Sequence, residues 1–135
     1  MNGRIVALLG LPALTAGVLL AAAPAHAATA VRIDSATVTG SASVTVNVAV
    51  EYSCDPRGFV RAAAVIAEDR RSGALGVTRF TPTCTGAAVT ALVPVKTLNR
   101  NSYAAGDPGS VRLSLMDSDD TEVLGVITQL TIRTA

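Results

Sequence analysis

From Ala30 onward, apolar and polar side chains alternate along the chain, which is the period of half-buried β-strands. The clearest run leads to Cys54, and the residues of its apolar parity are Val44, Val46, Val48, Val50, Tyr52 and Cys54. One face of this strand should pack in a core while the other meets water. Turns rich in Gly, Pro, Asp or Ser separate seven such runs, so we expect strands over Ala30–Thr39, Ser43–Cys54, Phe59–Glu68, Ala74–Thr83, Ala88–Lys96, Ser110–Asp117 and Glu122–Arg133.

No stretch after Ala30 has a sustained helical period. Short strands with frequent turns predict an all-β domain, a seven-stranded antiparallel immunoglobulin-like β-sandwich, with a small closed barrel as the alternative. Pro82 in the fourth run predicts that this strand lies at a sheet edge, because proline cannot donate to a ladder. The chain has no tryptophan, so the core residue typical of antibody domains is absent.

A different pattern precedes the strands. Arg4 is followed by an uncharged apolar run over residues 5–23, which ends in the small-residue pattern Ala25-His26-Ala27. This predicts a cleaved signal peptide over residues 1–27 and one secreted domain over residues 28–135. The apolar run is nearly as long as a bilayer span, so an uncleaved signal anchor is the alternative. After cleavage we expect no association with the membrane.

Cys54 and Cys84 are the only cysteines. An even number of cysteines in an exported chain predicts one disulfide. The antiparallel return of the fourth strand brings Cys84 back to the end of the domain where Cys54 lies. The two residues are far apart in sequence and have no neighbouring histidine, so we expect a structural bond rather than a redox pair or a zinc site.

The composition argues against several kinds of function. Residues 28–135 contain ten basic and ten acidic residues, so nothing indicates a surface for nucleic acid. The single histidine, His26, precedes the predicted cleavage site, which leaves no imidazole to act as a general base. No nucleophile motif occurs either. We therefore expect no enzyme, no catalytic residue and no cofactor.

One acidic cluster is a candidate calcium loop, formed by Asp117, Asp119, Asp120 and Glu122. Carboxylate oxygens are the ligands that Ca²⁺ takes, and Asp117 and Asp119 have the first spacing of a calcium loop. The glycine at the sixth position and the glutamate at the twelfth are missing. A solvated hairpin turn is the alternative, and we expect no metal here.

The longest connection, Thr97–Gly109, is a candidate recognition loop. Its candidate residues are of the types that binding loops use: Asn99, Arg100, Asn101 and Tyr103. The alternative is a structural connection in which Tyr103 packs against the sandwich edge. The glycines of the segment predict a loop that is not preorganised.

Five arginines gather around the third and fourth strands and their turns: Arg57, Arg61, Arg70, Arg71 and Arg79. They are a candidate patch for an acidic partner. Pairing with neighbouring carboxylates is the alternative.

Several segments together resemble a known group of proteins: Thr39–Val46, Tyr52–Pro56, Cys84–Gly86, and Gly106 followed by Ser110–Leu113. This pattern is similar to that of small secreted actinobacterial immunoglobulin-like β-sandwich proteins of unknown function. The resemblance implies export, one disulfide and a sandwich fold, and it implies no catalytic or binding residue.

These observations define the expected function only in general terms. We expect an exported module that is monomeric or weakly associating and recognises an extracellular protein, peptide or small ligand through loops or an edge strand, without enzymatic activity. The alternative is a passive structural component of the cell envelope or extracellular matrix.

Overall fold

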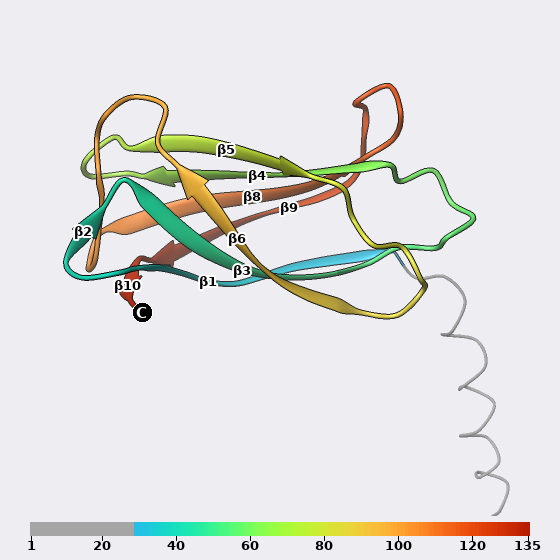
Figure 1. Ribbon diagram of the computed structural model, residues 1–135, viewed down its shortest axis with the longest axis horizontal. Coiled ribbons are helices and arrows are strands. Elements are labelled where there is room, and N and C mark those ends of the chain that lie inside the picture. The colour runs from blue at the N-terminus through green and yellow to red at the C-terminus, as the bar shows by residue number, and fades with distance from the viewer. Residues whose placement is uncertain (1–28) are drawn as a thin grey trace, which may run out of the picture.

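The computed structural model describes residues 29–135, and in this range the chain is all-β without a helix (Figure 1). The signal peptide expected over residues 1–27 lies outside the described residues. The strands are β1 (Ala30–Val38), β2 (Ala42–Ser43), β3 (Thr45–Ser53), β4 (Ala62–Asp69), β5 (Leu75–Phe80), β6 (Val89–Lys96), β7 (Tyr103–Ala104), β8 (Pro108–Met116), β9 (Glu122–Thr131) and β10 (Arg133–Thr134). The part of the chain described here also contains no helix long and apolar enough to cross a membrane.

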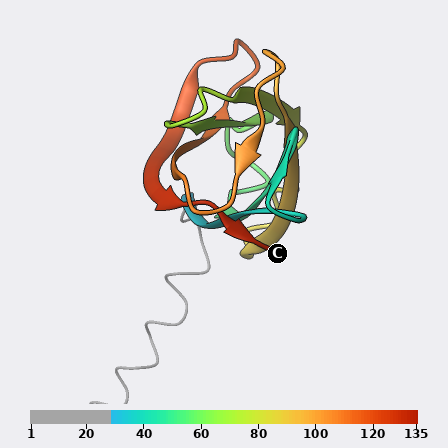
Figure 2. The same ribbon diagram turned by 90° about the vertical axis from the view of Figure 1, so that its left-hand side faces the viewer.

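Two four-stranded sheets and one short ribbon make up the fold. The first sheet has the strand order β10-β1-β3-β6, the second has the order β5-β4-β8-β9, and β2 pairs with β7. Neighbouring strands are antiparallel except β1 and β10, which run parallel. The sheets lie as two layers in Figure 1, and Figure 2 looks at the same layers from the end that carries β2.

One hydrophobic cluster joins the two sheets. It combines Val48 and Val50 of β3 with Val65 of β4 and Leu113 and Leu115 of β8, all of them buried. With four aromatic residues in the whole chain, packing rests mainly on branched aliphatic side chains, which suit a pleated surface.

The predicted core face of β3 is confirmed for most of its length. The buried residues of that parity are Val46, Val48, Val50, Tyr52 and Cys54. Val44 is exposed because it lies between β2 and β3, before the ladder with β6 begins at Thr45.

The strand count and several limits differ from the predicted ones. Each of the seven predicted ranges overlaps one longer strand, but β4 continues past its range to Asp69 and β8 begins before its range at Pro108. Three strands of two residues each bring the number among the described residues to ten. Phe59 is exposed and precedes β4, because Gly58 donates to the carbonyl of Asp55 and closes a turn before that strand starts. The last predicted strand is split at the buried Ile132, which donates to the carbonyl of Asp107 where the chain crosses to the other sheet.

Strand β5 lies at an edge of its sheet, as predicted, although Pro82 itself follows the end of the strand. Near the start of β5, a single bridge joins Gly76 to Thr97, and the Thr78 hydroxyl donates to the Pro94 carbonyl at 2.6 Å. Elsewhere β5 and β6 remain edge strands of separate sheets, so the described residues form two packed sheets rather than a closed barrel.

Cys54 and Cys84 form the predicted disulfide, with a Cα–Cα distance of 4.7 Å. It joins the end of β3 to the connection between β5 and β6. Two hydrogen bonds stabilise the same region. The main-chain N–H of Gly86 donates to the Cys54 carbonyl and that of Thr83 donates to the Tyr52 hydroxyl, each at 2.9 Å. We call this region the disulfide end.

Candidate functional site

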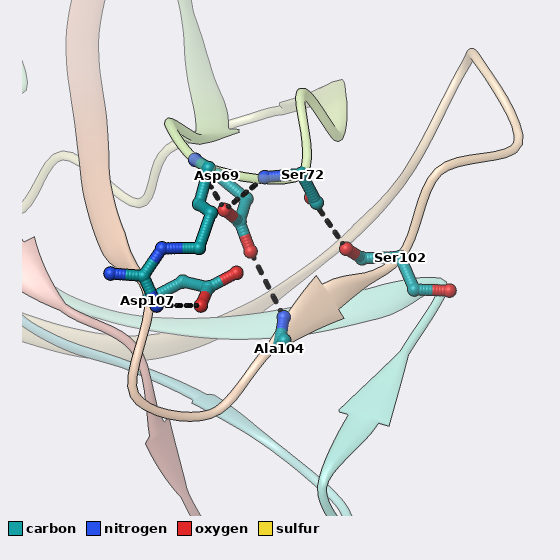
Figure 3. Close-up of polar contacts among 6 residues, drawn as sticks. Asp69, Ser72, Ser102, Ala104 and Asp107 are labelled. Atoms are coloured by element: carbon teal, nitrogen blue, oxygen red, sulfur yellow. Dashed lines mark hydrogen bonds and ion pairs between the residues drawn. The ribbon is translucent and has the colours of Figure 1, made fainter.

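The opposite end of the sandwich is organised around a buried acid. Asp69, the last residue of β4, has a relative exposure of 0%. Its Oδ1 accepts hydrogen bonds from the main-chain N–H groups of Arg71 and Ser72, each at 2.9 Å, and its Oδ2 accepts one from Ala104 at 3.0 Å (Figure 3). One carboxylate therefore ties the β4–β5 turn to β7, and we call this region the carboxylate end.

The local sequence explains the turn. An aspartate at the first position of a turn accepts hydrogen bonds from the N–H groups that follow it. The Asp69 N–H donates to the Ala74 carbonyl, and Gly73, in the left-handed conformation with φ of 81°, donates to the Asp69 carbonyl. Asp69 therefore fixes the turn through both its side chain and its main chain.

Tyr103 lies beside this acid and is fully buried. Its hydroxyl donates to the carbonyl of Ala67 at 3.0 Å. Burial, together with the negative charge of Asp69, raises the pKa of Tyr103 to about 12. Gly76 makes room for the ring, because a Cβ there would come within 2.8 Å of the Tyr103 hydroxyl and would overlap the Lys96 carbonyl.

Asp107 forms a pair with Asp69. Its Oδ1 accepts from Arg71 Nη1 at 3.1 Å. The hydrogen bond to Asp69, burial and the Asp69 charge raise the pKa of Asp107, against the effect of Arg71. Burial also acts to raise the pKa of Asp69, but the three main-chain N–H groups and Asp107 outweigh it, so the pKa of Asp69 is lowered. Asp69 is thus the ionised member, and Asp107 is the first to take a proton.

The loop before β7 is attached to the same turn. Asn99 Nδ2 donates to the Gly73 carbonyl and Ser72 Oγ donates to the Ser102 carbonyl, each at 2.7 Å. The Leu98 N–H donates to the Leu75 carbonyl at 2.8 Å. The sequence predicts a loop that is not preorganised, whereas side chains of the β4–β5 turn and of the loop itself attach residues 98–102 to that turn by hydrogen bonds.

The tip of this loop faces solvent. Leu98 is 73% exposed beside the exposed Leu75, and Arg100 is held at φ of 69°, which is uncommon for a residue other than glycine. The loop arches above β5 in Figure 1. We call the group Leu75, Leu98, Asn99, Arg100 and Asn101 the Leu98 surface.

The predicted recognition residues fall into two groups. Asn99, Arg100 and Asn101 are exposed at the loop tip, whereas Tyr103 is buried in the ribbon with β2. Of the two interpretations given for Tyr103, packing against the sandwich edge is the one that the structure contains. The reason is that its ring fills the space above Gly76 while its hydroxyl has a main-chain acceptor.

The acidic turn has separate partners for its carboxylates. Asp117 Oδ1 accepts from the main-chain N–H groups of Asp119 and Thr121, and Asp120 pairs with Arg79 at 2.7 Å. Glu122 binds Arg112 and Ser114. Across residues 29–135, no group of three or more His, Cys, Asp or Glu side chains is placed to hold a metal ion.

The five arginines are distributed rather than gathered. Arg71 and Arg79 pair with Asp107 and Asp120 from other segments, which matches the pairing alternative for these two. Arg61 donates to nearby carbonyls, and Arg70 donates to Gln129 Oε1.

The predicted third strand ends at Glu68, so Asp69 falls in the turn that follows it. A signal was present, since Asp69 continues the parity of the buried residues Ala63, Val65 and Ala67 along β4. An acid on the core parity at the end of a strand predicts a buried acceptor for the turn that follows.

No protein-family model matches the chain, and the search of curated proteins finds no significant relative.

Proposed function

We propose that residues 28–135 form an exported, non-enzymatic recognition module that binds an extracellular protein or peptide through the Leu98 surface. The observation that carries this proposal is the loop itself, which is fixed from below by hydrogen bonds and exposes a leucine and an arginine above. A fixed loop loses little conformational entropy on binding, and an exposed apolar side chain beside a cation is a typical contact for a protein partner. A projecting loop suits a macromolecule better than a small ligand, which favours concave sites.

We also propose that the fold is immunoglobulin-like, related to the secreted actinobacterial proteins that the sequence resembles. The arrangement of the seven longer strands supports this. β1, β3 and β6 share one sheet, and β4, β8 and β9 share the other. The constant-type immunoglobulin arrangement divides its first, second, third, fifth, sixth and seventh strands in the same way. The fourth strand, β5, differs, because it pairs with the third instead of the fifth.

Export to the extracellular space is part of the proposal. The disulfide fits an oxidising compartment, and the sequence before Ala28 has the pattern of a signal peptide. A non-enzymatic role is favoured by the use of the buried acids, since Asp69 binds main-chain N–H groups and Asp107 binds Arg71.

Site-specific cross-linking tests the proposal. A photoreactive phenylalanine analogue would replace Leu98 in one variant and Leu92 in another, since Leu92 is a similarly exposed leucine (63%) on the outer face of β6. Each variant is expressed in its native host and irradiated in the culture. We expect a discrete adduct from position 98 and none from position 92.

Adducts at neither position, or equal adducts at both, would contradict recognition by the Leu98 surface and favour the passive structural alternative. A discrete adduct from position 98 should also weaken when Arg100→Ala is added, because the same surface would lose its cation.

A further inference from the structure

The free edges of the two sheets are unequally protected. A sheet edge carries unpaired N–H and C=O groups, and proteins usually blunt it with charges, proline or bulges, or by covering it. The exposed edge of β1 has a register shift between Ile33 and Ser35 and carries Arg32 and Asp34. The edge of β6 carries Pro94 and Lys96.

Strand β5 is short, and part of its edge is covered. It has six residues, and its first half meets β6 and the following loop through the Gly76–Thr97 bridge and the bonds of Leu75 and Thr78.

Strand β9 lacks charge, proline and a bulge over most of its length, and β1 of the other sheet lies beside it without forming a ladder. It is the longest strand in the described range, and β8 is its only ladder partner. A register shift occurs at its start, and from Leu124 to Thr131 the pairing with β8 is regular. This segment, Leu-Gly-Val-Ile-Thr-Gln-Leu-Thr, has no charge and no proline, and β-branched residues favour the extended backbone.

Apolar side chains lie beside this edge on both faces of the sheet. Ile127 is 58% exposed on the outer face, and Val126 and Leu130 on the inner face are only partly buried against the core. Ile127 ends a row that crosses the outer face of the sheet through Arg112 and Ile66 to Val77. An additional strand beside β9 would extend this row and cover the inner residues.

We propose that β9 pairs with β9 of a second copy of this chain, antiparallel and about a two-fold axis, to form one continuous eight-stranded sheet. Two copies of β9 can pair with each other because the neutral segment 124–131 brings no like charges together. In the antiparallel arrangement, the start of one β9, where Glu122 binds Arg112 of its own chain, approaches the end of the other, where the chain crosses to Arg133 of β10, and this happens twice. The middle of the strand falls at Val126 and Ile127, so the most exposed apolar residue lies next to the axis.

The assembly stops at two copies. Each chain has one open β9 edge, and a two-fold interface uses both. A single added strand pair buries less than the roughly 1,200 Å² of a stable interface, so the dimer should be weak and dependent on concentration. This site is separate from the Leu98 surface, so either proposal can fail without the other.

Sedimentation analysis of the mature protein tests the pairing. We expect the mean mass to rise from one toward two copies as the concentration approaches about 1 mM, and to rise no further. Ile127→Lys should remove this rise, because an edge lysine opposes strand addition. Val77→Lys, in the same row at the opposite edge of the sheet and 42% exposed in the native chain, should dimerise like the wild type.

Amide hydrogen exchange supplies a second measurement that does not depend on a variant. Protection of residues 124–131 should increase with protein concentration, while protection of β5 should stay constant. A wild type that remains a single copy at about 1 mM, masses beyond two copies, or equal loss of dimer in both lysine variants would overturn the proposal.

Discussion

The two ends of the sandwich are held in different ways. At the disulfide end, one covalent bond joins two segments, the end of β3 and the connection that follows β5. At the carboxylate end, the side chain of Asp69 joins the β4–β5 turn to β7 without any covalent bond, and Asp107 and Arg71 add the start of β8. The covalent link stabilises mainly by restricting the unfolded chain, whereas the buried carboxylate acts in the folded state. Loss of the disulfide should therefore lower global stability, and loss of the Asp69 carboxylate should also release the loop over residues 97–103.

The largest effect should come from Asp69→Ala. Three main-chain N–H groups would lose their acceptor in a buried site, and because each unsatisfied group costs about 1–3 kcal/mol, we expect a loss of about 4 kcal/mol or more. Urea unfolding measures the change. The matched control is Asp117→Ala at the disulfide end, where a half-buried aspartate accepts hydrogen bonds from two main-chain N–H groups.

Water can replace the Asp117 carboxylate, so the control should lose only about 1 kcal/mol. Equal losses in the two variants would mean that the burial of Asp69 does not matter.

The next effect should come from the disulfide. With both Cys54 and Cys84 replaced by alanine, the protein should fold but lose roughly 3–4 kcal/mol, according to the entropy of the closed loop. Calorimetric melting measures this loss. Amide protection of Ala104 and Ser72 relative to the strands should stay unchanged, because the carboxylate end is intact. A melting temperature equal to that of the oxidised wild type would contradict a stabilising role of the disulfide.

A smaller effect is expected from Tyr103→Phe. The ring would still fill its space above Gly76, and only the hydroxyl bond to Ala67 would be lost. We expect a loss of about 1 kcal/mol, measured by urea unfolding, with no change in the loop. If Tyr103→Phe instead loosened residues 97–102, the tyrosine hydroxyl rather than Asp69 would be holding that end.

The smallest effect concerns pH. The pKa of Asp107 is raised in the folded state, so its contribution is present below the ordinary aspartate pKa of about 3.9 and is lost as pH rises through the folded-state value. The pKa of Asp69 is lowered, so its contribution is present above about 3.9 and is lost as pH falls through its own folded value.

The contribution of Asp107 is tested by comparing the unfolding free energies of the wild type and Asp107→Asn from about pH 7 to about pH 4. The wild type should gain stability relative to Asp107→Asn as pH falls through this range. A difference independent of pH would show that the two acids do not share their environment.

The contrast between the two ends also explains what the sequence could predict. Cysteine count and antiparallel return were sufficient for the disulfide, because the chain has only two cysteines. Alternation was sufficient for the buried face of β3, because it depends on neighbours in the chain. The pairing of β7 with β2 and the crossing at Ile132 involve contacts between segments distant in sequence, so no local pattern indicates them. Tyr103 was placed in a loop for the same reason, since the space that receives it is made by Gly76 from another strand.

The burial of Asp69 is the feature of the site that the sequence did not predict. In a sequence, Asp-Arg-Arg-Ser-Gly reads as a solvated turn, and its acidic residue gives no composition signal. Burial of the acid depends on three main-chain donors being brought to it, two from its own turn and one from β7. Only the parity of β4 indicated that the side chain points inward.

The most direct test of this account is the backbone ¹⁵N relaxation of residues 97–103 in the wild type and in Asp69→Ala. If the carboxylate end presents a fixed recognition surface, the wild-type loop should have order parameters of about 0.85, like the strands, and the variant should fall below about 0.6. Wild-type values already below about 0.6 would contradict a preorganised Leu98 surface, and unchanged values in the variant would contradict the role of Asp69 in holding it.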